Sequence, residues 1–97
     1  MDKQIGSASP LTVPNTLLIV DDDAINRAIL ENIFLPYHAI RMAENGRQGL
    51  NMILAEPEAF CAVLLDVMMP EMDGIQVLRL LKEHGLMDRL PVFLITA

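Results

Sequence analysis

Residues 17–23 read LLIVDDD, four apolar side chains followed directly by three acids. A short run that is apolar at every position predicts a β-strand covered on both faces, as strands of a parallel sheet are. A second run of this kind, residues 61–65, also ends in an acid, Asp66. The sequence therefore predicts two buried parallel strands, each with a carboxylate at its carboxyl end.

Helical segments and two further strands account for the rest of the fold. After the acids, Ile25, Ile29 and Ile33 recur at every fourth position with Leu30 and Phe34 beside them, which predicts a helix with one apolar face that ends before Pro36. Asn45 and Asp73 are each followed three positions later by a glutamine, as at the start of a capped helix. Strands alternating with helices are typical of βαβ units. We expect an edge strand at residues 38–43, a last strand at residues 91–96, and buried helix stripes formed by Leu50, Ile53, Leu54, Val77, Leu78 and Leu81.

The composition predicts one small folded domain. The chain has 97 residues, of which 53% are hydrophobic and 21% charged, and this balance excludes an intrinsically disordered protein. We expect a flexible N-terminal tail over residues 1–15 and the folded domain over residues 16–97. Cys61 is the single cysteine, so it cannot form an internal disulfide, and we expect it in the core.

Charge and hydropathy limit where in the cell we expect this protein and which partners we expect it to bind. No apolar run approaches the roughly 20 residues of a membrane-spanning helix, and no signal peptide is recognisable, so we expect a cytoplasmic protein with no membrane contact. The net charge of −6 would repel a phosphate backbone. Direct binding to nucleic acid is therefore not expected.

Acidic and hydroxyl side chains follow three of the predicted strands. Asp21 and Asp22 follow the first, Asp66 ends the third and Thr96 ends the fourth. Because the carboxyl ends of parallel strands share one edge of a sheet, we expect these residues to meet there. Carboxylates held together repel unless a cation lies between them, and an all-oxygen ligand set suits Mg²⁺ or Mn²⁺. Taken alone, the acid triplet could equally be a solvated turn that caps a helix.

Four segments carry a family signature: LLIVDDD at 17–23, AENGRQGL at 43–50, LLDVMMPEMDG at 64–74 and LPVFLITA at 90–97. In order and spacing they closely resemble the receiver domain of bacterial two-component response regulators. The resemblance implies a flavodoxin-like, doubly wound α/β fold with a parallel sheet of strand order 2-1-3-4-5. Four strands and three helices of that fold are present, so we expect a receiver truncated after the fourth strand, without the fifth strand and the last two helices.

The resemblance also implies a role for each residue at the sheet edge. Asp66 would be the phosphoacceptor, modified by a sensor histidine kinase or a phosphotransfer protein. Asp22 would bind Mg²⁺ directly, Asp21 would act on it through water, and Met68 would contribute its backbone carbonyl. Thr96 would be the switch hydroxyl that turns toward the phosphate. Such a module signals to a downstream output domain or target protein and turns over no metabolite, so we do not expect an enzyme.

One family feature has no counterpart here. In the family a lysine at the end of the fifth strand also contacts the phosphoryl group. Lys3, in the predicted tail, and Lys82, within a predicted helix, do not match it. We therefore expect Asp66 to accept a phosphoryl group only when the following strand is supplied by a longer chain or by another molecule.

Two other functions remain open on the sequence alone. A phosphohydrolase resembling the haloacid dehalogenase superfamily would use Asp21 as its nucleophile in an Asp-x-Asp arrangement, although Ala24 and Ile25 do not fit that motif. A receiver-like interaction module that is never phosphorylated is the other. Phosphate incorporated on Asp66 would indicate a receiver, and on Asp21 a hydrolase. No stable incorporation would indicate an interaction module.

The last predicted strand also bears on assembly. Residues 91–96 would be an interior strand in a complete receiver fold and would here form an apolar edge. We expect Leu18, Val20 and Leu64 to lose cover on the sheet face shared with the first helix. The sequence therefore predicts a homodimer or a swapped assembly of this chain.

Overall fold

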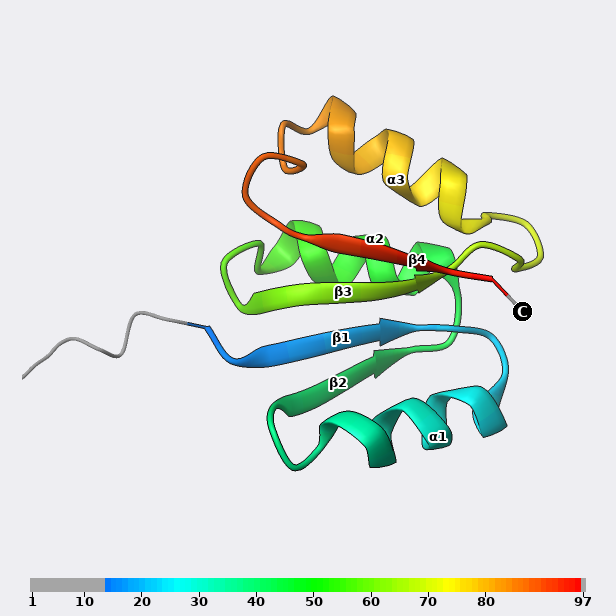
Figure 1. Ribbon diagram of the computed structural model, residues 1–97. Helices are drawn as coiled ribbons and strands as arrows, with labels where there is room; N and C mark the ends of the chain where they lie inside the picture. Colours follow the sequence, from blue (N-terminus) through cyan, green and yellow to red (C-terminus); the bar gives the residue numbers. More distant parts are fainter. Residues whose placement is uncertain (1–13, 97) are drawn as a thin grey trace, which may run out of the picture.

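A computed structural model describes residues 14–96 of the chain (Figure 1). Strands and helices alternate in the predicted order, and the observed ends differ from the predicted ones by about one residue. The elements are β1 Thr16–Val20, α1 Ala24–Phe34, β2 Ala39–Ala43, α2 Gly46–Ala55, β3 Phe60–Asp66, α3 Gly74–Glu83 and β4 Val92–Ile95. The predicted tail over residues 1–15 lies almost wholly outside the described residues and stays a prediction.

The four strands form one parallel sheet in the order β2-β1-β3-β4. The parallel sheet, the edge position of β2 and the first four positions of the strand order implied by the family resemblance are thereby confirmed. Val20 lies opposite Leu65 in the β1–β3 pair, and Asp66 lies opposite Ile95 in the β3–β4 pair. This register brings the carboxyl ends of β1, β3 and β4 to the same edge of the sheet.

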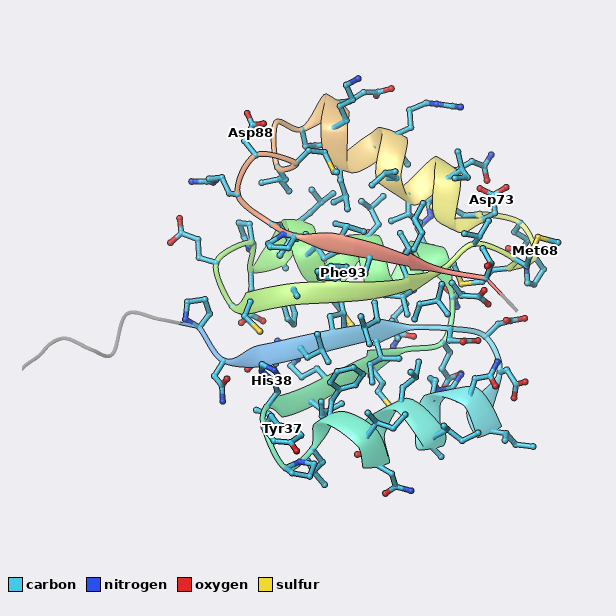
Figure 2. All side chains as sticks on the ribbon, viewed as in Figure 1. Tyr37, His38, Met68, Asp73, Asp88 and Phe93 are labelled. Atoms are coloured by element: carbon cyan, nitrogen blue, oxygen red, sulfur yellow. The ribbon has the colours of Figure 1, made fainter. Side chains whose placement is uncertain are left out.

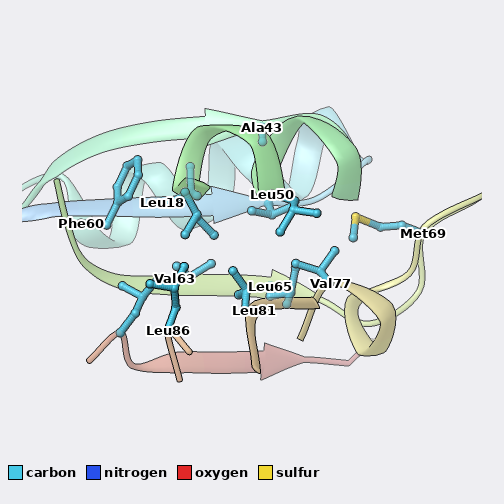
Figure 3. Packing of buried hydrophobic residues seen from close by; sticks show 13 residues of the cluster. Leu18, Ala43, Leu50, Phe60, Val63, Leu65, Met69, Val77, Leu81 and Leu86 are labelled. Atoms are coloured by element: carbon cyan, nitrogen blue, oxygen red, sulfur yellow. The ribbon is translucent and has the colours of Figure 1, made fainter. Parts of the chain in front are cut away.

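The larger core lies on the face of the sheet covered by α2 and α3 (Figure 3). Alternate residues of β1 and β3 point into it, because successive side chains of a strand face opposite sides of the sheet. Their helix partners include Leu50 and Ile53 of α2 and Val77 and Leu81 of α3. The capping predictions are also confirmed, since the side chains of Asn45 and Asp73 accept the N–H groups of Gln48 and Gln76.

The other face, beneath α1, is packed more lightly. Its buried residues are Leu17, Ile19 and Leu64, with Leu30 and Phe34 of α1 packed against them. None of the side chains of α1 is itself buried. The helix is therefore held to the sheet by partly exposed contacts.

The structure corrects the predicted orientation of several residues. Leu18 and Val20 belong to the core beneath α2 and α3, so only Leu64 of the predicted set faces α1. Within the predicted apolar face of α1, only Leu30 and Phe34 pack against the sheet, whereas its three isoleucines are more than half exposed. Three residues predicted to be buried are at least partly exposed, namely Leu54, Leu78 and Cys61.

None of the helices within residues 14–96 has the length and apolar character needed to cross a membrane.

Candidate functional site

The acidic segment that follows β1 gives each of its three aspartates a different environment. Asp21 is only 3% exposed, and its N–H continues the sheet by donating to the carbonyl of Ala43 at 3.2 Å. Its Oδ1 accepts the N–H of Asp23 at 2.9 Å, and Asp23 in turn caps α1 by accepting the N–H of Ile25. Asp22 is exposed, and within residues 14–96 its side chain forms no hydrogen bond. The helix-cap interpretation therefore holds for Asp23 and leaves the carboxylate of Asp22 free to bind a ligand.

Asp66 is held at the end of β3 by the loop that leads into α3. The N–H of Val67 donates to the carbonyl of Ile95 at 3.1 Å, which ties the loop to β4. The N–H of Met68 donates to Oδ1 of Asp66 at 3.1 Å and orients its carboxylate. A side chain at Gly74 would collide with the backbone carbonyl oxygen of Asp66, so glycine allows α3 to start this close to the backbone at the end of β3.

These two segments bring three carboxylates together, as the strand ends predicted. One oxygen from each of Asp21, Asp22 and Asp66 lies within 4.8 Å of the other two. The three side chains range from buried (Asp21) through half-buried (Asp66) to exposed (Asp22). The cluster is therefore anchored in the sheet and open to solvent on one side.

The electrostatics of this cluster favour a bound cation. Burial raises the pKa of Asp66 above its ordinary value, and the charges of Asp21 and Asp22 with a hydrogen bond to Asp21 raise it further. The hydrogen bond from Met68 acts in the opposite direction. A divalent cation among the three oxygens would remove the repulsion, and a few carboxylates with space for water are a ligand set that suits Mg²⁺. The residues present thus fit such an ion.

Two hollows flank the cluster. One, of about 240 Å³, is lined by Asp21, Asp66 and Thr96 with Asn26 and three apolar side chains of α1 and β4. The other, of about 690 Å³, lies between the loops before α2 and α3 and is lined by Asp22 and by Arg47 among others. Asp66 thus opens into the hollow that also contains Thr96, while Asp22 opens into the second.

The remaining predicted residues take the following places. Thr96 and Asp66 both line the smaller hollow, together with residues of α1. The side chain of Met68 is 73% exposed and points outward (Figure 2), so its backbone is the part that faces the site. The assigned roles of the five residues at this edge stay predictions. His38 and Cys61 contact each other, with 3.7 Å between Nδ1 and Sγ, and His38 lies at the opposite end of the sheet in Figure 2.

Arg27 and Asn26 belong to the neighbourhood of the site but were not identified from the sequence. Nη1 of Arg27 donates to the backbone carbonyl of Asp21 at 2.7 Å, and Asn26 lines the smaller hollow. Both lie in the first turn of α1, directly after the acid triplet. The helical pattern placed them on a helix, but only the tertiary structure shows which way each side chain turns.

Comparison with known proteins identifies the family. The sequence matches the response regulator receiver domain family over residues 17–97. The chain belongs to this family. It is 37% identical over 87 residues to the response regulator MprA of Mycolicibacterium vanbaalenii, covering 88% of this chain and 36% of MprA. MprA of Mycobacterium bovis is 36% identical over 83 residues, which are 84% of this chain and 34% of that protein.

Solved receiver structures share the fold. A chain of the CheX-CheY-BeF3-Mg complex from Borrelia burgdorferi has a TM-score of 0.78 at 30% identity, over 88% of this chain and 63% of that one. The N-terminal domain of a response regulator receiver protein from Methanoculleus marisnigri has a TM-score of 0.76 at 30% identity, over 86% and 67% respectively. The receiver described here spans about a third of the length of the curated relatives that it matches.

The raised pKa of Asp66 predicts that binding of Mg²⁺ at the carboxylate cluster would depend on pH. A protonated carboxyl must lose its proton before it binds the ion, so the affinity should fall as pH decreases from 7 toward the pKa of Asp66. Substitution Asp66→Asn should weaken binding and flatten this pH dependence, whereas Asp88→Asn, at an exposed site in the loop after α3, should change neither. Calorimetric titration with MgCl2 at several pH values measures both effects.

The raised pKa of Asp66 also determines whether its charge stabilises or destabilises the metal-free protein. Because the pKa of Asp66 is raised on folding, its charged form destabilises the protein above that pKa, and the penalty disappears as pH falls through it. Asp66→Asn should therefore raise the melting temperature at pH 7. Saturation with Mg²⁺ at a hundred times its Kd should stabilise the wild type by about 2.7 kcal/mol. A pH-independent affinity that Asp66→Asn leaves unchanged would contradict this account of the cluster.

Proposed function

We propose that this chain is a phosphorylatable receiver of a two-component system, with Asp66 as phosphoacceptor. One observation carries the proposal: the carboxylate of Asp66 lies at the open end of the sheet within 4.8 Å of two further carboxylates. Membership of the receiver family supports the same assignment. The phosphoryl group would come from a histidine of a sensor kinase or phosphotransfer protein.

In the proposed transfer, a carboxylate oxygen of Asp66 attacks phosphorus while the bond from phosphorus to the donor imidazole nitrogen breaks. The imidazole takes up a proton as it leaves, and the product is an acyl phosphate on Asp66. The N–H of Met68 orients the attacking carboxylate by donating to Oδ1. Water later attacks phosphorus, which releases inorganic phosphate and restores the carboxylate. The domain thus catalyses its own modification, and we propose no turnover of a metabolite.

We propose that Asp21, Asp22, Asp66 and the backbone carbonyl of Met68 hold Mg²⁺, or Mn²⁺ in its place. When bound, the ion offsets negative charge on the phosphoryl oxygens. Asp22, exposed and without a hydrogen bond in the described part of the chain, is the side chain best placed to bind it directly. Asp21 is already committed through Oδ1 to the N–H of Asp23, which favours its contact through water.

Signalling would follow from the charge added at Asp66. A phosphoryl group there is an acceptor for the hydroxyl of Thr96, which lines the same hollow. The loop after β3 is also tied to β4 by the hydrogen bond from Val67 to Ile95. A turn of Thr96 would therefore alter the surface at the end of β4, where a downstream output domain or target protein can read it. A cytoplasmic location, and no direct binding to nucleic acid given the net charge of −6, complete the proposal.

Mass spectrometry of the chain after incubation with acetyl phosphate and MgCl2 tests this function. In a longer chain that adds the following strand, we expect label on Asp66, lost in Asp66→Asn and kept in Asp88→Asn. Residues 1–97 alone should be labelled little or not at all, because loss of one charged contact to the transition state commonly costs about 10²-fold in rate. Label on Asp21 would instead support a hydrolase, and no label in either chain would contradict a phosphorylated receiver.

We also propose that the chain of residues 1–97 self-associates through β4. Within residues 14–96, β4 pairs only with β3, and Phe93 and Leu94 are 56% and 41% exposed. An apolar cavity of about 410 Å³ adjoins Phe93, which lines it together with Leu17, Leu64 and others. Exposed apolar strands of this kind pair readily with another copy.

Sedimentation velocity at micromolar concentration tests the assembly. The wild type should sediment as a dimer or larger species, and Phe93→Ser should shift it toward the monomer. Tyr37→Ser is the matched control, because Tyr37 is also an exposed aromatic side chain but lies away from β4 (Figure 2). A wild type that remains at 10.8 kDa and unfolds cooperatively would show the proposal to be wrong.

A further inference from the structure

Helix α1 depends on polar contacts for its position next to the cation site. None of its side chains is buried, whereas α2 and α3 each contribute several residues to the core. At its first turn, the cap by Asp23 and the hydrogen bond from Arg27 to the carbonyl of Asp21 tie the helix to the preceding loop. Arg27 therefore links a lightly packed helix to the loop that carries two of the three clustered carboxylates.

Arg27 binds a backbone carbonyl and not one of the nearby carboxylates. Several carboxylates lie close to it in sequence, including those of Asp22, Asp23 and Glu31. Within residues 14–96, however, Arg27 forms no ion pair, and its guanidinium donates its hydrogen bond to a backbone oxygen. A guanidinium bound to one of the clustered carboxylates would compete with a cation for the same oxygens. Bound to the carbonyl, it can hold the loop and leave those oxygens available.

The carbonyl of Asp21 is the part of the loop that determines where Asp22 lies. A peptide unit is planar, so the C=O of Asp21 is rigidly connected to the N and Cα atoms of Asp22. The N–H of Asp21 is fixed by Ala43, and its side chain by the N–H of Asp23. The side chain of Asp22 has no such hydrogen bond in the described residues, so its placement depends on the backbone.

We propose that Arg27 is a positioning residue for the cation site, because it fixes the peptide unit from which the Asp22 carboxylate projects. The proposal rests on the proposed function, in which Asp22 binds Mg²⁺. Residues that orient a metal ligand from the next layer contribute measurably to affinity without touching the ion.

Loss of the Arg27 charge and loss of its contact with the loop predict opposite effects on Mg²⁺ binding. Removing a positive charge near three carboxylates should strengthen binding of a dication on electrostatic grounds alone. Releasing the Asp21–Asp22 peptide should weaken it. Arg47 supplies the matched control, because it lines the hollow that contains Asp22, but within residues 14–96 its side chain forms no hydrogen bond or ion pair.

The experiment is a calorimetric titration of the wild type and variants with MgCl2, with melting curves recorded without metal. Arg27→Gln and Arg27→Met should each weaken Mg²⁺ binding by about tenfold, the lower end of the cost of losing such a supporting contact. Arg47→Gln should bind Mg²⁺ as tightly as the wild type or more tightly. Arg27→Lys, whose ammonium can still donate to a carbonyl, should recover part of the loss. Should one of the two neutral variants fail to unfold cooperatively, the other gives the answer.

The outcomes separate this proposal from the function on which it rests. Unchanged or tighter Mg²⁺ binding by the neutral Arg27 variants would overturn the positioning role alone, and so would a lowered melting temperature with an unchanged Kd. A wild type without Mg²⁺ binding that depends on Asp22 would overturn the proposed site, and with it the role of Arg27. Weakened binding confined to the Arg27 variants supports both.

Discussion

Repulsion among three carboxylates at the open edge of a parallel sheet is the constraint on which the site depends. The β1–β3 pairing imposes it, because strands that are more than forty positions apart in sequence end side by side with an acid each. Burial is the largest cause of the raised pKa of Asp66, the repulsion raises it further, and together they make the cluster a place where a cation is favoured. Conformational stability and metal binding are therefore connected, because the same charges that disfavour the metal-free fold would provide the affinity for Mg²⁺.

The surrounding structure holds these charges together through backbone contacts. The core beneath α2 and α3 fixes β1 and β3, while the turn at Asp21, the cap at Asp23 and the N–H of Met68 orient the loops. Gly74 lets α3 begin against the carbonyl of Asp66. The face beneath α1 contributes less, which is why a single long side chain such as Arg27 can matter for the geometry of the loop.

Much of this arrangement was predictable from the sequence because its determinants are local. Continuous apolar runs mark strands buried on both faces. An Asp or Asn with a Gln three positions later marks a capped helix, as Asp73 and Asn45 show. Convergence of Asp21, Asp22 and Asp66 followed from the rule that parallel strands end at one edge. Which part of the apolar face of α1 packs against the sheet did not follow, since the isoleucines and the pair Leu30 and Phe34 are neighbours on one helix and only packing selects between them. The partial exposure of Cys61 and the reach of Arg27 to a backbone carbonyl likewise depend on tertiary contacts that residue types do not encode.

A crystal structure of the protein with Mg²⁺ and beryllofluoride, a phosphoryl mimic, tests the central claim most directly. The account predicts beryllofluoride on the carboxylate of Asp66, with the cation held by Asp22, Asp66 and the carbonyl of Met68, and with Asp21 one water molecule away. Beryllofluoride on Asp21, or a cation bound at another part of the molecule while the three aspartates remain empty, would contradict it.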